Sequence, residues 1–128
     1  MRIKQLLCAC ALTFSFEASG AESDWIEVTT SDSGSSWQVR ADDVLNTTNK
    51  NPHVWIKVDA SKDKTVQFRE QKIFAWIDCN YQTVKIVSSV TYASDGAVLR
   101  STSTPYASTD PIVPDTVMDG VREAVCPR

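Results

Sequence analysis

The chain has 128 residues, a length typical of one domain, and carries 13 basic and 16 acidic side chains. The resulting formal net charge of −3 argues against nucleic acids and anionic membranes as partners, because both are bound through clusters of Lys and Arg. One histidine and four glycines leave little material for a histidine-based catalytic site or a Gly-rich phosphate-binding loop.

The first 21 residues have the three parts of a secretory signal peptide. Residues 1–4 are short and basic, residues 6–16 (LLCACALTFSF) are apolar, and residues 19–21 are small, which predicts cleavage after Ala21. The apolar run is shorter than the roughly 20 residues of a membrane span. The alternative, a buried N-terminal helix, fits the charge and the cleavage site less well. We therefore expect an exported domain of residues 22–128, with no membrane insertion after cleavage of the signal peptide.

The four cysteines divide into an early and a late pair. Cys8 and Cys10 lie in the signal peptide, where Leu7–Cys10 has roughly the shape of a bacterial lipobox. This run leaves almost no apolar residues ahead of it, so we expect both cysteines to be discarded. The remaining domain has 11 basic and 15 acidic residues, a formal net charge of −4. Its two cysteines, Cys79 and Cys126, predict one disulfide in an oxidising compartment.

The first half of the exported domain predicts short strands and polar turns. Two short strands flank a turn rich in Ser, Asp and Gly, which indicates a hairpin. A single helical turn over residues 41–45 and a polar loop follow. In the next strand Val54, Ile56 and Val58 share one face, whereas Trp55 and Lys57 share the other. The predicted strands are residues 25–28, 37–40 and 54–58.

The segment from Thr65 to Cys79 is long for one strand, and its alternation changes phase. Val66 and Phe68 share a face with Phe74 and Trp76, whereas Ile73, Ala75 and Ile77 share the face of Cys79. The residues between these two groups, 69–71, are all polar. This pattern predicts a bulge or a break at residues 69–71.

Two further strands are predicted over residues 83–93 and 97–103. In the first, Val84, Ile86, Val90 and Tyr92 alternate with polar or small residues. Ser94-Asp95-Gly96 predicts a hairpin between the strands, because Asp-Gly supplies the positive φ angles of a type I′ turn. Residues 104–114 contain three prolines and are expected to form a loop.

The last segment predicts a helix and completes the fold. Asp115 is the expected N-cap, Val117, Val121 and Val125 have helical spacing, and Gly120 weakens the helix before Pro127 ends it. About six hairpin-linked strands followed by one helix indicate an α+β fold. We expect an antiparallel meander sheet packed against the C-terminal helix and joined to it by the Cys79–Cys126 disulfide.

No residue pattern favours catalysis, a metal or a cofactor. A catalytic site built on histidine would need His53, which we interpret as a partly exposed residue at the start of a strand. A zinc site would need more His or Cys ligands than the exported domain has. Carboxylate pairs, Asp42 with Asp43 and Asp59 with Asp63, fall in turns and are interpreted as solvated. We expect a protein that is not an enzyme.

The aromatic residues of the central strands predict an interaction surface. If Cys79 faces the helix, then Phe74 and Trp76 point to the opposite side of the sheet, where Trp55 also points. One helix covers only one face, so an aromatic cluster on the other face favours a protein contact or a dimer contact. The alternative is that a loop or the N-terminal hairpin covers this face. Full burial of both Phe74 and Trp76 within a monomer would contradict the prediction.

The order of these features resembles the surface-adhesin protein E family of exported proteobacterial proteins. The resemblance extends over essentially the whole exported domain. The features that carry it are Trp25 and Trp37, the Val54-Trp55 strand, Asp78-Cys79 at a strand end, the turn from Tyr92 to Gly96, and the Pro114-Asp115 helix start that leads to Cys126.

The resemblance implies a six-stranded antiparallel sheet on a C-terminal helix, a disulfide between the two matching cysteines, and homodimers as one assembly. It also implies a protein-binding function, with host extracellular-matrix or serum proteins such as laminin and vitronectin as partners. The founding member is lipid-anchored, whereas Cys10 is badly placed for an anchor. Periplasm, cell surface and secretion all remain open. The alternative function is a periplasmic structural or envelope-stress protein, or an inhibitor of a cell-wall-degrading enzyme.

Overall fold

The computed structural model describes residues 24–45, 48–104 and 106–128. The predicted signal peptide, with Cys8 and Cys10, lies outside the described residues. The elements in chain order are β1 (Trp25–Thr30), β2 (Ser36–Arg40), α1 (Ala41–Leu45), β3 (His53–Asp59), β4 (Glu70–Asp78), β5 (Thr83–Tyr92), β6 (Val98–Ser103), β7 (Asp110–Pro111) and α2 (Val117–Val125).

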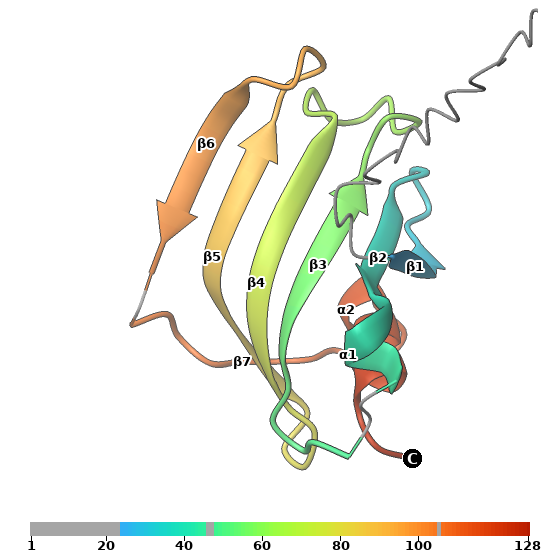
Figure 1. The fold of residues 1–128 in the computed structure, drawn as a ribbon, viewed down its shortest axis with the longest axis vertical. Helices are drawn as coiled ribbons and strands as arrows, with labels where there is room; N and C mark the ends of the chain where they lie inside the picture. Colours follow the sequence, from blue (N-terminus) through green and yellow to red (C-terminus); the bar gives the residue numbers. More distant parts are fainter. Residues whose placement is uncertain (1–23, 46–47, 105) are drawn as a thin grey trace, which may run out of the picture.

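The strands form one antiparallel sheet in which β1 to β6 lie in the order of the chain (Figure 1). This arrangement confirms the predicted meander, and the single helical turn at residues 41–45 is present as α1. The predicted loop 104–114 contains one addition, the two-residue β7. It pairs with the start of β5 through Thr83 with Pro111 and Val84 with Asp110. The chain after β6 thereby returns along the sheet to begin α2.

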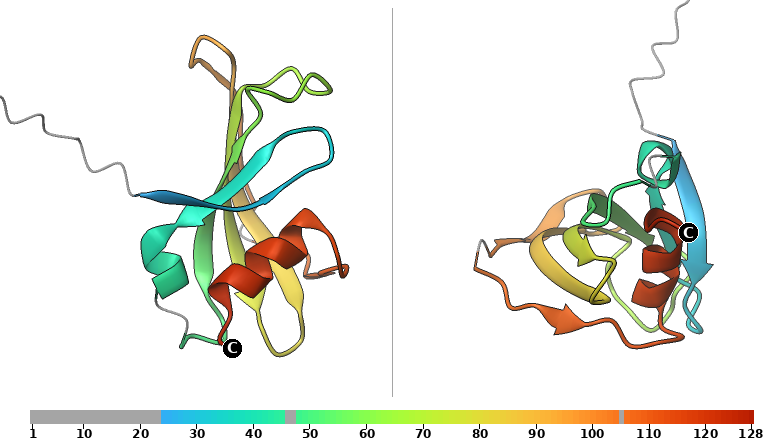
Figure 2. Two further views of the ribbon diagram at one scale, coloured as in Figure 1. Left: turned by 90° about the vertical axis from the view of Figure 1, so that its right-hand side faces the viewer. Right: turned by 90° about the horizontal axis from the view of Figure 1, so that it is seen from below.

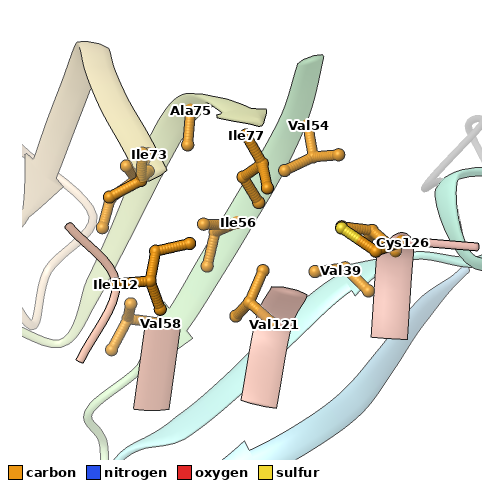
Figure 3. Packing of buried hydrophobic residues seen from close by; sticks show 12 residues of the cluster. Val39, Val54, Ile56, Val58, Ile73, Ala75, Ile77, Ile112, Val121 and Cys126 are labelled. Atoms are coloured by element: carbon orange, nitrogen blue, oxygen red, sulfur yellow. The ribbon is translucent and has the colours of Figure 1, made fainter. Parts of the chain in front are cut away.

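The hydrophobic core lies between one face of the sheet and α2 (Figures 2 and 3). Alternation along β3 and β4 sends every second side chain to this face, and the valines of α2 meet them from the other side. Ile112, in the segment after β7, also packs into this layer. The side chains with at most 5% exposure include Val39, Val54, Ile56, Val58, Ile73, Ala75, Ile77, Val121 and Val125.

The strand β5 departs from the predicted alternation at its centre. Its pairing with β4 shifts register between Phe74 and Ala75, so β5 carries one extra residue there. Val87, at the bulge, is buried, while Ile86 is opposite Ala75 and 43% exposed. The bulge reverses the side-chain phase after it, so Val90 and Tyr92, opposite Lys72 and Glu70, lie on the other face from Val84 and do not continue the predicted alternation.

The predicted break before β4 is present, but the strand expected ahead of it is not. Residues 65–69 form an irregular loop, and β4 begins at Glu70. The loop is closed by a backbone bond from Ala60 N–H to the Arg69 carbonyl at 2.8 Å. Inside it, the Asp63 carboxylate accepts hydrogen bonds from the backbone N–H and the hydroxyl of Thr65. These bonds hold a compact turn, so the segment does not form a strand although Val66 and Phe68 have strand-like spacing.

The Asp-Gly hairpin joins β5 to β6, although its turn type differs from the prediction. A type I′ turn needs positive φ at both central residues, whereas only Gly96 has one, at 85°. The Gly96 N–H donates to the Ala93 carbonyl and the Ala93 N–H donates to the Ala97 carbonyl. This is a three-residue loop in which glycine takes the left-handed position.

The N-cap of α2 is Thr116 and not Asp115. The Thr116 hydroxyl accepts from the Asp119 N–H, while the Asp119 carboxylate accepts from the Asp115 N–H at 3.1 Å. This second bond, followed by the one from Arg122, lowers the pKa of Asp119. Asp115 itself lies outside the helix with a φ of 63°. The N-cap therefore lies one residue later than predicted, because the Thr116 hydroxyl and the Asp119 carboxylate cap this helix together.

Gly120 lies on the side of α2 that packs against Thr29 of β1. A Cβ atom at this position would lie 3.0 Å from Cβ and 3.2 Å from Cγ2 of Thr29. We expect Gly120→Val to lower the free energy of unfolding by about 1–3 kcal/mol, because the added atoms overpack the contact. Urea denaturation measures this change.

The matched control for this substitution is Glu123→Val, which places the same residue on the exposed side of the same helix. Valine is a better helix former than glycine, so helix propensity alone would stabilise Gly120→Val, and a variant as stable as the unchanged protein would contradict the overpacked contact.

Candidate functional site

The two cysteines form the predicted disulfide, which belongs to the framework of the fold. Cys79 directly follows β4 and Cys126 is the C-cap of α2, and the bond between them spans 47 residues of sequence. Cys126 is buried in the core cluster and Cys79 packs against it. The bond therefore fixes the end of the helix to the end of the central strand.

Trp55, Phe74 and Trp76 lie on the face of the sheet opposite to the core. Trp55 in β3 is the cross-strand partner of Phe74 in β4, and their ring centroids are 4.9 Å apart. Both are partly buried, whereas Trp76 is 40% exposed. The condition that would have contradicted the sequence prediction, full burial of Phe74 and Trp76, is therefore not met.

His53 extends this group of rings, although the sequence indicated only a partly exposed strand start. It is the cross-strand partner of Trp76, and the two rings stack at 4.3 Å with an interplanar angle of 8°. His53 also meets Phe74 edge-on at 6.3 Å. The alternation that grouped Trp55 with Lys57 also places residue 53 on this face. We call His53, Trp55, Phe74 and Trp76 the aromatic face.

Lysines border the aromatic face and stand over its neighbouring rings. Lys85 Nζ lies 5.8 Å from the ring centroid of Trp76, Lys72 Nζ lies 5.7 Å from that of Tyr92, and Lys57 Nζ lies 5.6 Å from that of Trp25. These distances are within the range of cation–π attraction. Lys57 also forms an ion pair with Glu70 at 3.3 Å. The surface thus combines stacked rings with positive charge, on a domain whose net charge is negative.

Asp63 was expected to be a solvated turn residue, but it is buried. Its Oδ2 accepts hydrogen bonds from the hydroxyls of Ser35 at 2.6 Å and Ser33 at 2.7 Å, and its Oδ1 accepts from the Thr65 N–H at 2.9 Å. These bonds join the β1–β2 hairpin loop to the loop before β4. Because both oxygens are satisfied within the protein, Asp63 has a structural role.

The Asp63 hydrogen bonds make stability depend on pH. The hydroxyls of Ser35, Thr65 and Ser33 hold the pKa of Asp63 far below its ordinary value. The folded protein therefore binds a proton here less readily than the unfolded chain. The stabilisation is complete above the unfolded pKa of about 3.9, and it is lost as the pH falls toward the folded value.

We expect Asp63→Asn to reduce the drop in urea midpoint between about pH 5 and pH 3. Asp32→Asn is the control, because it removes a carboxylate from the same hairpin loop without removing an acceptor of these bonds. The assignment is wrong if Asp63→Asn and the unchanged protein lose the same midpoint over this interval.

Within residues 24–45, 48–104 and 106–128, no group of three or more His, Cys, Asp or Glu side chains could hold a metal ion. In the same part of the chain, no helix has the length and apolar character needed to cross a membrane.

Comparison with known proteins identifies one family. The family model described as surface-adhesin protein E matches residues 25–127, from the first residue of β1 to the second residue after α2. The match includes every strand, both helices, the disulfide and the aromatic face. No curated protein and no solved structure matches the chain.

Proposed function

The chain belongs to the surface-adhesin protein E family, and from this premise we propose that it is an exported, non-catalytic binding module that contacts a protein partner through its aromatic face. The observation that carries the proposal is the exposure of Trp76 within a stack of rings on the sheet face opposite to α2. The family is one of adhesin-like surface proteins, which supports a protein as the partner.

The two faces of the sheet have different roles, one in folding and one in the proposed binding. The face toward α2 supplies the core, so its residues are required for folding. The aromatic face has no second layer among the described residues, and Trp76 stays 40% exposed there. Large rings held in place by stacking lose little freedom on binding, and tryptophan is the residue type most enriched in binding hot spots. A rigid sheet with preformed rings suits recognition of another protein.

The lysines around the rings favour a partner with an acidic surface. Lys72 and Lys85 have no acidic partner within ion-pair distance among the described residues, whereas Lys57 is paired with Glu70. Their charge would accelerate encounter with a negatively charged patch, and it would do so less at high salt. We propose a host extracellular-matrix or serum protein as this partner, with laminin and vitronectin as the first to be tested.

A second copy of the chain is the competing occupant of the aromatic face. Sedimentation velocity at micromolar concentration distinguishes the two. A dimer that Trp76→Ala converts to a monomer would assign this face to self-association and contradict the proposed host partner. If the protein is a monomer, or a dimer that Trp76→Ala leaves intact, the aromatic face is free to bind another protein.

Location is tested by protease treatment of intact cells, followed by detection with an antibody to the exported domain. We expect loss of the signal while a periplasmic control protein survives, because a host-binding module must be exposed outside the cell. Protection of the protein, with release on osmotic shock, would contradict the proposal. That outcome would favour a structural protein of the periplasm or an inhibitor of a cell-wall-degrading enzyme.

A further inference from the structure

A pocket opens at one end of the aromatic face, where β3 begins, β4 ends and β5 begins. Its volume is about 210 Å³, and its lining includes Asn51, His53, Trp76, Asp78, Thr83 and Lys85. Pockets for drug-sized ligands have volumes of roughly 300–1,000 Å³. This one suits a ligand no larger than a single sugar ring.

The walls of the pocket are held by backbone hydrogen bonds. On one side, the Ile77 N–H donates to the Pro52 carbonyl at 3.0 Å and the Cys79 N–H donates to the Lys50 carbonyl at 2.9 Å, which fixes Asn51 between them. On the other side, Thr83 is paired with Pro111 of β7. The Cys79–Cys126 disulfide lies directly beyond this end of β4. The pocket is therefore preformed, and little conformational entropy of the protein is lost when a ligand binds.

The base of the pocket is a row of three side chains on adjacent strands. His53, Trp76 and Lys85 are consecutive cross-strand partners in β3, β4 and β5. The imidazole stacks on the indole and Lys85 Nζ lies over the same ring, yet Trp76 remains 40% exposed. The exposed part of the indole is an apolar surface against which the C–H groups of a sugar ring can pack.

The polar groups of the pocket match hydroxyl groups better than they match a charged ligand. Lys85 donates hydrogen bonds, the Asn51 amide and the Thr83 hydroxyl both donate and accept, and Asp78 accepts. Asp78 Oδ1 already accepts from the N–H groups of Asn80 and Tyr81, but a carboxylate retains further acceptor sites. The positive charge of Lys85 is opposed by the negative charge of Asp78. A sugar hydroxyl both donates and accepts, so it can use this mixed set.

We propose that this pocket binds a single neutral pyranose unit, with its C–H groups against the exposed part of Trp76 and its hydroxyls bonded to Asn51, Asp78 and Lys85. This site goes beyond the proposed protein contact: it shares His53, Trp76 and Lys85 with that contact, whereas Trp55 and Phe74 are outside the pocket lining and Asn51 and Asp78 are outside the aromatic face. A partner that carries glycans could occupy both.

The test is a titration of the exported protein with the methyl glycosides of glucose, galactose, mannose and N-acetylglucosamine. The readout is the indole N–H signal of Trp76 in proton–nitrogen correlation spectra, assigned with Trp76→Phe. We expect a saturable shift with at least one glycoside at millimolar concentration. Asn51→Ala and Lys85→Met should each weaken it at least tenfold. Lys72→Met, the same change at the lysine over Tyr92, should leave it unaltered.

Three outcomes would overturn the inference. They are no saturable shift with any of the four glycosides, a shift that survives both pocket variants, and a shift caused by acetate or inorganic phosphate in place of the glycosides. Failure of this site and failure of the protein contact are distinguishable. A Trp55→Ala/Phe74→Ala variant removes rings outside the pocket, whereas Asn51→Ala changes a pocket residue that is not part of the aromatic face.

Discussion

Replacing Cys79 and Cys126 with alanine is expected to lower the free energy of unfolding by about 4 kcal/mol. The disulfide closes a loop of 47 residues, and in the chain-entropy model a crosslink of this span removes about that much conformational freedom from the unfolded state. The bond also holds the C-cap of α2, and Val121 and Val125 on this helix have no exposed surface. Because domains of this size have stabilities of about 5–15 kcal/mol, the loss is a large fraction of the total.

The measurement is thermal unfolding followed by circular dichroism, with and without a reductant. We expect the double alanine variant to unfold about 15–25 °C below the oxidised protein. The reductant should lower the midpoint of the unchanged protein and leave that of the variant unaltered. A difference of only a few degrees between oxidised protein and variant would show that packing of α2, and not the covalent bond, holds the helix on the sheet.

Ile56→Ala is expected to cost about 2–5 kcal/mol, because it leaves a cavity in the centre of the core. Ile56 has no exposed surface, and its cross-strand partners Val39 and Ile73 are also buried. The residues around Ile56 are therefore tightly packed, and they can fill only part of the cavity that alanine leaves. Urea denaturation at constant pH gives the change in free energy directly.

The neighbouring substitution Trp55→Ala is the matched control, because it lies one residue away on the same strand and on the other face. We expect it to cost about 1 kcal/mol, the loss of one aromatic cross-strand pair with Phe74. If Trp55→Ala destabilised the protein as much as Ile56→Ala, the aromatic face would be a second core, and the proposed division between the two faces would be wrong.

The sequence predicts this fold well where alternation and burial act in the same direction. Along β3 and β4, buried positions alternate with less buried ones, so the side chains that meet α2 could be assigned from the period of two before the structure was known. The aromatic face follows from the same pattern, since Trp55, Phe74 and Trp76 occupy the other phase. The pairing of Cys79 with Cys126 was predictable because residues 22–128 contain no other cysteine.

The errors occur where tertiary contacts decide the local structure. The bulge at Val87 shifts the phase of β5, and a single inserted residue has no signature in the alternation itself. The loop around Asp63 depends on hydroxyls from Ser33 and Ser35, which are about 30 residues away in the sequence. Alternation places His53 on the face of Trp55, but its stacking on Trp76 depends on the register between β3 and β4. Register cannot be deduced from one strand alone.

The most direct test of the proposed function is a binding measurement with immobilised laminin and vitronectin. Four forms of the exported protein are compared by surface plasmon resonance: unchanged, Trp55→Ala/Phe74→Ala, Trp76→Ala, and Leu45→Ala. Leu45 is 80% exposed at the end of α1, so its removal deletes an apolar side chain away from the aromatic face. Thermal unfolding of each form confirms that it is folded.

We expect the unchanged protein and Leu45→Ala to bind at least one of the two proteins equally well. The aromatic-face variants should bind at least 30-fold more weakly, as removal of a hot-spot residue costs about 2 kcal/mol or more. Equal binding by all four forms would place the contact elsewhere on the molecule. Binding of neither protein by the unchanged form would contradict the proposed host partner.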